Sequence, residues 1–252
     1  IESFIASGNV TLHQESEYYY LHTSPEFAMK RLLSAGLGSI YQICKVFRYG
    51  ENGRLHNSEF TMLEWYRLDV NYHQLMDEIA ELLRMILQEF TDSSLPGLPI
   101  EKITYTHAFL QYTGLDPNEA SITELSDYLI SKQHVVEGFD GCGRDIWLDY
   151  ILSEFVQPKL GCGNLTFLFD FPANRAALAN IRVDKIPVAE RFELFIDGVE
   201  LANGYQELNE PVELRKRLSQ EQVIRKNNNQ LRVGLDENLI AACRSGLPTC
   251  SG

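Results

Sequence analysis

The sequence has few cysteines, and no two of them form a close pair. Its five cysteines are spread along the 252 residues: Cys44, Cys142, Cys162, Cys243 and Cys250. An odd number argues against a disulfide framework, and without a C-x-x-C pair we expect no structural zinc site. This cysteine content favours a reducing compartment, so we expect a cytoplasmic protein.

Long apolar runs and basic residues are also scarce. No run approaches the roughly 20 apolar residues of a transmembrane helix, and the N-terminus lacks the pattern of a signal peptide, so we expect no membrane contact. The 22 lysines and arginines against 35 aspartates and glutamates give a net charge of −13. This charge disfavours a broad nucleic-acid surface, which needs clustered basic residues, but it leaves room for a local basic site.

What is present is the composition of a globular protein with a full core, with 44% hydrophobic and 23% charged residues. Apolar spacing and capping residues predict helices over residues 24–36, 73–90, 144–158, 211–229 and 236–246, with another opening at Ser121. Alternation and β-branched content predict strands over 39–49, 59–70, 165–172 and both arms of 190–208. Antiparallel strands with helices between them indicate an α+β fold.

The segment FRYGENGRLHNSEFTMLEWYR, residues 47–67, combines basic, acidic and aromatic residues. In a strand, Phe60, Glu64 and Tyr66 point to one face, which suits a ligand with a planar base at one end and an amine at the other. The guanidinium of Arg48 suits a phosphate group. The alternative is a half-buried hairpin whose charges are solvated.

The segment ERFELFIDGVELANGYQEL is predicted to be a hairpin that turns at Asp197-Gly198. This turn places Glu193 and Glu200 as diagonal neighbours on one face, where two carboxylates suit Mg²⁺. The alternative is two separately solvated glutamates. An alternating set follows that could surround an ammonium group with an amide, a phenol and a carboxylate: Asn203, Tyr205 and Glu207.

Four segments carry a resemblance to a known family. FRYGENGRLHNSEFTMLEWY resembles the second signature motif of class II aminoacyl-tRNA synthetases in its lysine-type form. TSPEFAMKRLL and GVELANGYQELNEP resemble the flanking lysine-pocket and metal-binding segments, and GLPTCSG resembles the lead-in to the third motif. ELANGYQEL and LPTCSG are most similar to the lysyl-tRNA synthetase paralogues that attach (R)-β-lysine to elongation factor P.

The resemblance implies a class II catalytic fold, an antiparallel sheet flanked by helices, in a homodimeric enzyme. It implies a single catalytic domain over 1–252 with a helical insertion at 93–165. It also places the first and third signature motifs beyond the two ends, so we expect a chain that is incomplete at both. The implied reaction uses ATP and Mg²⁺ to activate lysine or (R)-β-lysine as an adenylate and transfers it to elongation factor P.

The resemblance also assigns roles residue by residue. The catalytic residue would be Arg48, at the ATP α-phosphate. The other ATP-binding residues would be Tyr49, Gly50, Glu51, His56, Asn57, Phe60, Glu200 and Leu201. The substrate-binding residues would be Ser24, Pro25, Glu26, Glu64, Tyr66, Asn203, Tyr205 and Glu207. The ligands of Mg²⁺ would be Glu193 and Glu200.

One departure from the family pattern and two alternatives complete the prediction. Gly50 stands where the family has glutamate, and we expect the adjacent Glu51 to replace it. The first alternative is the catalytic core of a lysyl-tRNA synthetase that charges tRNA with lysine. The second is a binding protein that has kept the fold and lost catalysis. The absence of an anticodon-binding barrel and the negative charge favour a protein acceptor over tRNA.

Overall fold

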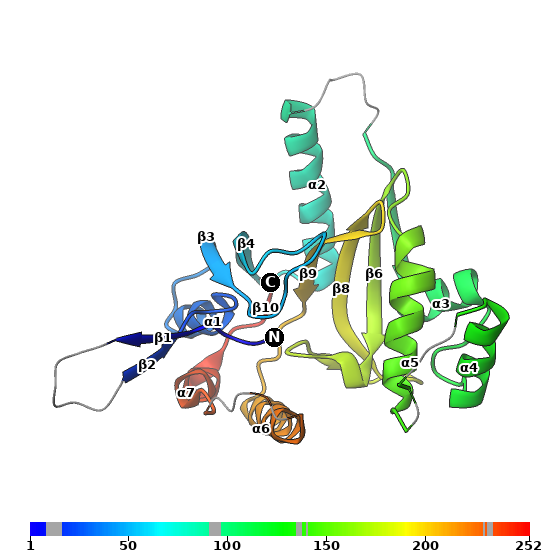
Figure 1. The fold of residues 1–252 in the computed structure, drawn as a ribbon. Helices are drawn as coiled ribbons and strands as arrows, with labels where there is room; N and C mark the ends of the chain where they lie inside the picture. The colour runs from blue at the N-terminus through cyan, green and yellow to red at the C-terminus, as the bar shows by residue number, and fades with distance from the viewer. Residues whose placement is uncertain (9–16, 91–96, 135–137, 140, 229, 231–233) are drawn as a thin grey trace. The chain divides into compact units, whose positions relative to one another are not determined.

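The computed structural model describes residues 1–8, 17–90, 97–134, 138–139, 141–228, 230 and 234–252 (Figure 1). The chain divides into two compact units. One consists of Ile1–Val70 with Glu207–Gly252, and the other of Asn71–Gln206. The first unit therefore joins segments from both ends of the chain.

The first unit is built on helix α1 and a small antiparallel sheet. Its elements are β1 (Ile5–Gly8), β2 (Glu17–Tyr20), α1 (Glu26–Ser34), β3 (Ile40–Phe47), β4 (Glu59–Leu68), α6 (Pro211–Asn227), α7 (Glu237–Gly246) and β10 (Cys250–Ser251). Strand β4 lies between β3 and β10, and β1 pairs separately with β2. Helix α7 packs on α1 and α6. The predicted helices in this part of the chain are confirmed, and α1 begins one residue after Pro25, which occupies the N-cap position.

Strand β4 has the predicted alternation. Its register pairs Val46 with Phe60, Gln42 with Glu64 and Ile40 with Tyr66 across the hairpin with β3. Phe60, Glu64 and Tyr66 are all at least half-buried. On the other face Glu59, Thr61 and Leu63 are exposed, and only Trp65 is half-buried as well. One face of this hairpin therefore carries the ring, the carboxylate and the phenol in a row.

The second unit is a five-stranded sheet with helices. Its elements are α2 (Tyr72–Phe90), β5 (Ile100–Thr104), α3 (Tyr105–Thr113), α4 (Ile122–Ser131), α5 (Arg144–Ile151), the π-helix η1 (Leu152–Val156), the 3-10 turns η2 (Gln157–Lys159) and η3 (Ala173–Arg175), β6 (Leu165–Pro172), β7 (Ile181–Arg182), β8 (Val188–Ile196) and β9 (Val199–Tyr205). The sheet order is β5-β6-β8-β7, and β9 also pairs with β8. Strand β8 is central, and its middle residues 192–195 are buried.

Segment 93–165 supplies much of the core of this unit. Figure 1 shows α3, α4 and α5 grouped beside β6, and α3 contacts β6 directly. Tyr105 and Phe109 of α3 are fully buried and stack near Phe171 of β6. The segment also contains β5, which pairs with β6 in parallel, whereas every other pair in this sheet is antiparallel. Strand β5 was not predicted from the sequence.

Local sequence signals are confirmed at two termini. Ser121 caps α4, and its hydroxyl accepts from the backbone N–H of Glu124 while the Glu124 carboxylate accepts from the backbone N–H of Ser121. The hairpin β8–β9 turns at Asp197 and Gly198, which both adopt positive φ, as a two-residue turn of this sequence requires. No described helix is long and apolar enough to cross a bilayer.

Candidate active site

Three carboxylates and one ammonium group gather in the first unit. Lys30 of α1 is 3% exposed, and its Nζ lies 2.6 Å from Glu26 Oε1 and 2.5 Å from Glu207 Oε2. Beside them on β4, the Tyr66 hydroxyl donates to Glu64 Oε1 over 2.9 Å. Because three carboxyl groups stand near a single ammonium group, the cluster favours a further positive charge.

The backbone around this cluster fixes its members. Glu26 and Lys30 are one helical turn apart, so they share a face of α1. The backbone N–H of Glu207 donates to the carbonyl of Cys250, which ties the residue to β10. Gly252 lies against the ring of Tyr66, since a Cβ at this position would be 2.3 Å from Tyr66 Cδ1. The lead-in to the third motif therefore packs directly on the phenol.

Burial and mutual repulsion shift the titration of the cluster. Burial raises the pKa of Glu64 to about 7, and the Tyr66 hydrogen bond offsets part of this shift. Burial raises the pKa of Glu207 to about 8, against the opposing effect of Lys30. The two carboxylates raise the pKa of Lys30 by more than burial lowers it, so this side chain stays protonated. A further cation in the cluster would therefore favour ionisation of Glu64 and Glu207.

Arg48 and Phe60 form the second feature of this unit. The guanidinium carbon of Arg48 lies 5.2 Å from the centre of the Phe60 ring, and its Nε donates to the carbonyl of Thr23 over 3.2 Å. The Glu51 carboxylate lies 3.7 Å from Arg48 Nη1. Glu51 thus stands beside the arginine, and its replacement of the glutamate expected at Gly50 stays a prediction.

The other predicted residues of this unit lie just before α1 and in the connection between β3 and β4. The hydroxyl of Ser24 accepts from the backbone N–H of Glu26 over 3.4 Å, next to Pro25. Gly50 adopts a φ of 82°, in the region that favours glycine. Tyr49, His56 and Asn57 are exposed. The ring of Tyr49 packs edge-on against Phe4, so it is a structural contact as well as a loop residue.

The hairpin β8–β9 carries the predicted residues of the second unit. Phe195 pairs with Glu200, as predicted, and Glu193 pairs with Asn203, whose amide donates to it over 3.5 Å. The register shifts between these pairs and leaves Leu201, which is 50% exposed, without a partner across the ladder. The irregularity in the ladder therefore lies just before Asn203-Gly204. Tyr205 is half-buried at the end of β9.

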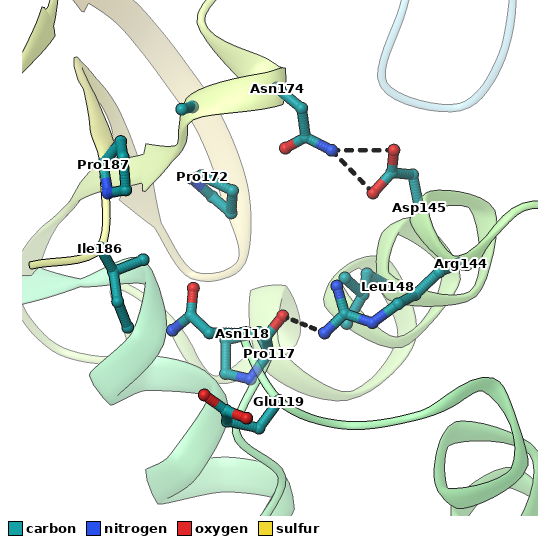
Figure 2. Close-up of a pocket in the computed structure, with 11 residues that line it drawn as sticks. Pro117, Asn118, Glu119, Arg144, Asp145, Leu148, Pro172, Asn174, Ile186 and Pro187 are labelled. Atoms are coloured by element: carbon teal, nitrogen blue, oxygen red, sulfur yellow. Dashed lines mark hydrogen bonds between the residues drawn. The ribbon is translucent and has the colours of Figure 1, made fainter.

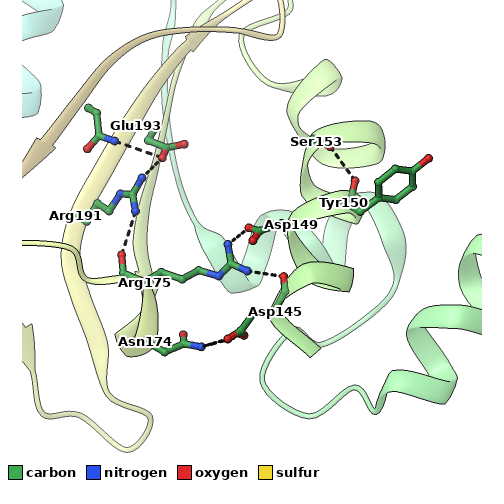
Figure 3. A network of polar contacts seen from close by, with 9 residues as sticks. Asp145, Asp149, Tyr150, Ser153, Asn174, Arg175, Arg191 and Glu193 are labelled. Atoms are coloured by element: carbon green, nitrogen blue, oxygen red, sulfur yellow. Dashed lines mark hydrogen bonds and ion pairs between the residues drawn. The ribbon is translucent and has the colours of Figure 1, made fainter. Parts of the chain in front are cut away.

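Glu193 is held by an arginine that the sequence analysis missed. It is 8% exposed and forms an ion pair with Arg191 of the same strand (Figure 3). Burial raises the pKa of Glu193, and the positive charges of Arg191 and Arg175 offset part of the shift. The signal was present in the sequence, because residues two apart in a strand share a face.

A polar network continues from Arg191 to helix α5 (Figure 3). Arg191 Nη1 donates to the carbonyl of Arg175 over 3.0 Å, and the Arg175 guanidinium pairs with Asp149. The amide of Asn174 in turn donates to both oxygens of Asp145 at 2.9 Å. The carboxylate of Glu193 is thus anchored to the helical layer through two arginines.

The hairpin fits a Mg²⁺ ion only in part. Glu193 and Glu200 share a face, and the exposed Glu200 is accessible to a ligand. However, a metal ion would have to share the Glu193 carboxylate with Arg191. Within the described ranges, no group of three or more His, Cys, Asp and Glu residues could hold a metal ion. Substrate phosphate oxygens would therefore have to complete the coordination.

A separate pocket of about 360 Å³ lies between α5 and the loops of the second unit (Figure 2). Its polar wall is formed by Asn118, Glu119, Arg144, Asp145 and Asn174. The guanidinium of Arg144 donates to the carbonyls of Pro117 and Ala120 at 2.6 Å, so its donors are used to hold the backbone. None of the predicted site residues lines this pocket.

Known proteins match this chain over most of its length. The model for the class II tRNA synthetases of the D, K and N type matches residues 3–252. The elongation factor P–(R)-β-lysine ligase of Vibrio vulnificus (strain YJ016) is 43% identical over 242 residues, which are 95% of this chain and 72% of the relative. The ligases of the same name from Pseudoalteromonas translucida (strain TAC 125) and Haemophilus ducreyi are 43% and 40% identical, over 95% of this chain and 72% and 70% of theirs. The chain therefore belongs to the class II tRNA synthetase family, in its aspartate, lysine and asparagine branch.

Proposed function

We propose that this chain activates a lysine-type amino acid with ATP and transfers it to a lysine side chain of elongation factor P. The observation that carries the proposal is the cluster of Glu26, Glu64 and Glu207 around Lys30. It leaves negative charge for a substrate with two ammonium groups, which distinguishes lysine and (R)-β-lysine from the other amino acids of this branch. The names of the three ligases support the acceptor.

The activation step needs positioning and charge neutralisation. The substrate carboxylate attacks the α-phosphorus of ATP, and pyrophosphate leaves as negative charge builds on the phosphoryl oxygens. Arg48 is proposed to bind the α-phosphate, because its guanidinium is a planar double donor. Phe60 offers a ring face for adenine, and Tyr49, Gly50, Glu51, His56, Asn57 and Leu201 would border the nucleotide.

The other proposed contacts follow from charge for the carboxylates and from the family resemblance for the neutral residues. Glu64 and Tyr66 would hold one ammonium group of the substrate, with Ser24, Pro25, Asn203 and Tyr205 bordering it. Mg²⁺, when bound by Glu200 and Glu193, would neutralise charge on the phosphates. No covalent enzyme intermediate is required, because the adenylate itself carries the activated acyl group to the acceptor amine. We also propose a cytoplasmic homodimer.

Transfer to elongation factor P is tested by incubating the protein with ATP, (R)-β-lysine and purified elongation factor P. Mass spectrometry should show one lysine-sized addition to elongation factor P and none without ATP. The matched reaction contains tRNA and α-lysine instead. Efficient charging of tRNA without modification of elongation factor P would favour the lysyl-tRNA synthetase alternative.

The pH dependence of amino-acid binding should report Glu64. Its pKa of about 7 means that the carboxylate is protonated in acid and ionised in base. Because an ammonium group binds the ionised form, the KM for the amino acid should rise as pH falls through 7. Steady-state adenylation between pH 6 and 9 measures this profile.

The variant Glu64→Gln is the control for the pH dependence. An amide has no charge to gain, so its KM should be high and nearly constant from pH 6 to 8. A variant that keeps the wild-type pH profile would remove Glu64 from the ammonium site.

A further inference from the structure

The residue that distinguishes this pocket from a simple acidic patch is Lys30. It is a lysine at 3% exposure on α1, and the two carboxylates that it contacts come from segments far apart in the sequence. A buried ammonium group is costly unless it is paired and hydrogen-bonded. Lys30 meets that condition, because its Nζ forms ion pairs with Glu26 and Glu207 within 2.6 Å and donates a hydrogen bond to Glu26.

Lys30 also divides the carboxylates of the cluster into two kinds. Glu26 and Glu207 share its ammonium group, whereas Glu64 has only the Tyr66 hydroxyl as its hydrogen-bonding partner in the cluster. Once Glu64 and Glu207 are ionised, three carboxylates stand against one ammonium group and the pocket has an excess of negative charge. A lysine-type substrate brings two ammonium groups, so the charges of pocket and substrate are complementary.

We propose that Lys30 is a positioning residue for the amino-acid substrate: it holds the Glu26 and Glu207 carboxyl groups in place and favours the ionised form of Glu207. The proposal rests on the proposed function, since it concerns the same pocket. Without Lys30, Glu26 and Glu207 would repel each other, and the pKa of the buried Glu207 would rise further. The pocket would then lose a charge that the substrate needs.

The charged and titratable groups that act on this cluster come from several elements. They are Glu26 and Lys30 of α1, Arg48 after β3, Glu64 and Tyr66 of β4, Glu207, Cys243 of α7 and Cys250 of β10. Burial and the nearby Glu207 raise the pKa of Cys250 to about 12, so this thiol stays neutral. The pH response of a Lys30 variant is therefore expected to come from the carboxylates.

The first test compares Lys30→Met with Lys30→Arg in amino-acid-dependent adenylation. Methionine has a similar length and no charge, so the KM for the amino acid should rise more than tenfold at pH 7 and recover in part towards pH 9, where Glu207 ionises. The KM for ATP should stay within about twofold. The arginine variant keeps the positive charge and should lie between methionine and wild type. An unchanged KM in Lys30→Met, or equal losses of kcat alone in both variants, would overturn the proposal.

The second test reads the charge pair without any substrate. Thermal unfolding at pH 7.5 is measured for Lys30→Met, Glu207→Gln and the double variant. Lys30→Met alone should lower the unfolding midpoint by about 10 °C, because it leaves buried carboxylates unpaired. The unfolding midpoint of the double variant should fall by less than that of Lys30→Met alone. If the decreases in unfolding midpoint of the two single variants simply add in the double variant, the proposal is overturned even when the enzyme is active. If the two variants are coupled but the protein activates no amino acid, only the proposed function is refuted.

Discussion

Replacing Arg48 with alanine should reduce adenylate formation about a thousandfold while leaving the fold intact. A reduction of this size follows from the loss of a charged donor at the phosphoryl group, which gains negative charge in the transition state. The fold should survive because the side chain is partly exposed, at 23%, and makes one hydrogen bond to Thr23 and a contact with Phe60. Those contacts contribute about 1–2 kcal/mol to the free energy of unfolding.

Pyrophosphate exchange and circular dichroism together measure this effect. Arg48→Lys keeps the charge but loses the planar fork, so we expect it to retain only part of the activity. Arg84→Ala on α2 removes an equivalent charge and should exchange pyrophosphate as the wild type does. If Arg48→Ala kept full activity, Arg48 would have no place in the mechanism.

Replacing Gly161 with alanine should destabilise the protein by about 3–5 kcal/mol. Gly161 adopts a φ of 74°, and a Cβ there would be 2.5 Å from the carbonyl oxygen of Phe195 and 2.6 Å from the Cα of Ile196. Both are backbone atoms of β8, so no side chain can move aside. The carbonyl of Gly161 also accepts from the backbone N–H of Asp197, which ties the turn of the β8–β9 hairpin to this loop.

The chain offers a matched control two residues away. Gly163 has nearly the same φ, 77°, but a Cβ there would meet no atom within 4 Å. Gly163→Ala should therefore cost only the backbone strain, about 1 kcal/mol. Urea unfolding of the two variants separates strain from collision. An equal decrease in the free energy of unfolding in both variants would show that the close approach of Gly161 to β8 has no energetic consequence.

Most of the correct fold predictions rest on strong local patterns in the sequence. The alternation of 59–70, the Asp197-Gly198 turn and the capping box at Ser121 are set by neighbours in the sequence, and the structure confirms all three. Strand β5 was missed because its five residues, IEKIT, contain two charges and no clear alternation. Its place is decided by pairing with β6, which a local pattern does not show.

The acidic residues of the candidate site could be predicted from the sequence, but the residues that neutralise them were not. The carboxylates of Glu64, Glu193 and Glu207 were identified, but their counter-ions Lys30 and Arg191 were not. A lysine on an amphipathic helix is ordinarily solvated, and only the fold reveals that Lys30 is buried against Glu207. Arg191 was the more predictable of the two, because it lies two residues from Glu193 on the same strand.

Amino-acid-dependent exchange of pyrophosphate into ATP tests the central claim most directly. The protein is incubated with ATP, Mg²⁺ and labelled pyrophosphate, with α-lysine, (R)-β-lysine, aspartate or asparagine as the amino acid. The account predicts exchange with at least one of the two lysines and none above background with aspartate or asparagine. Exchange that is absent with both lysines, or equally fast with aspartate, would contradict it.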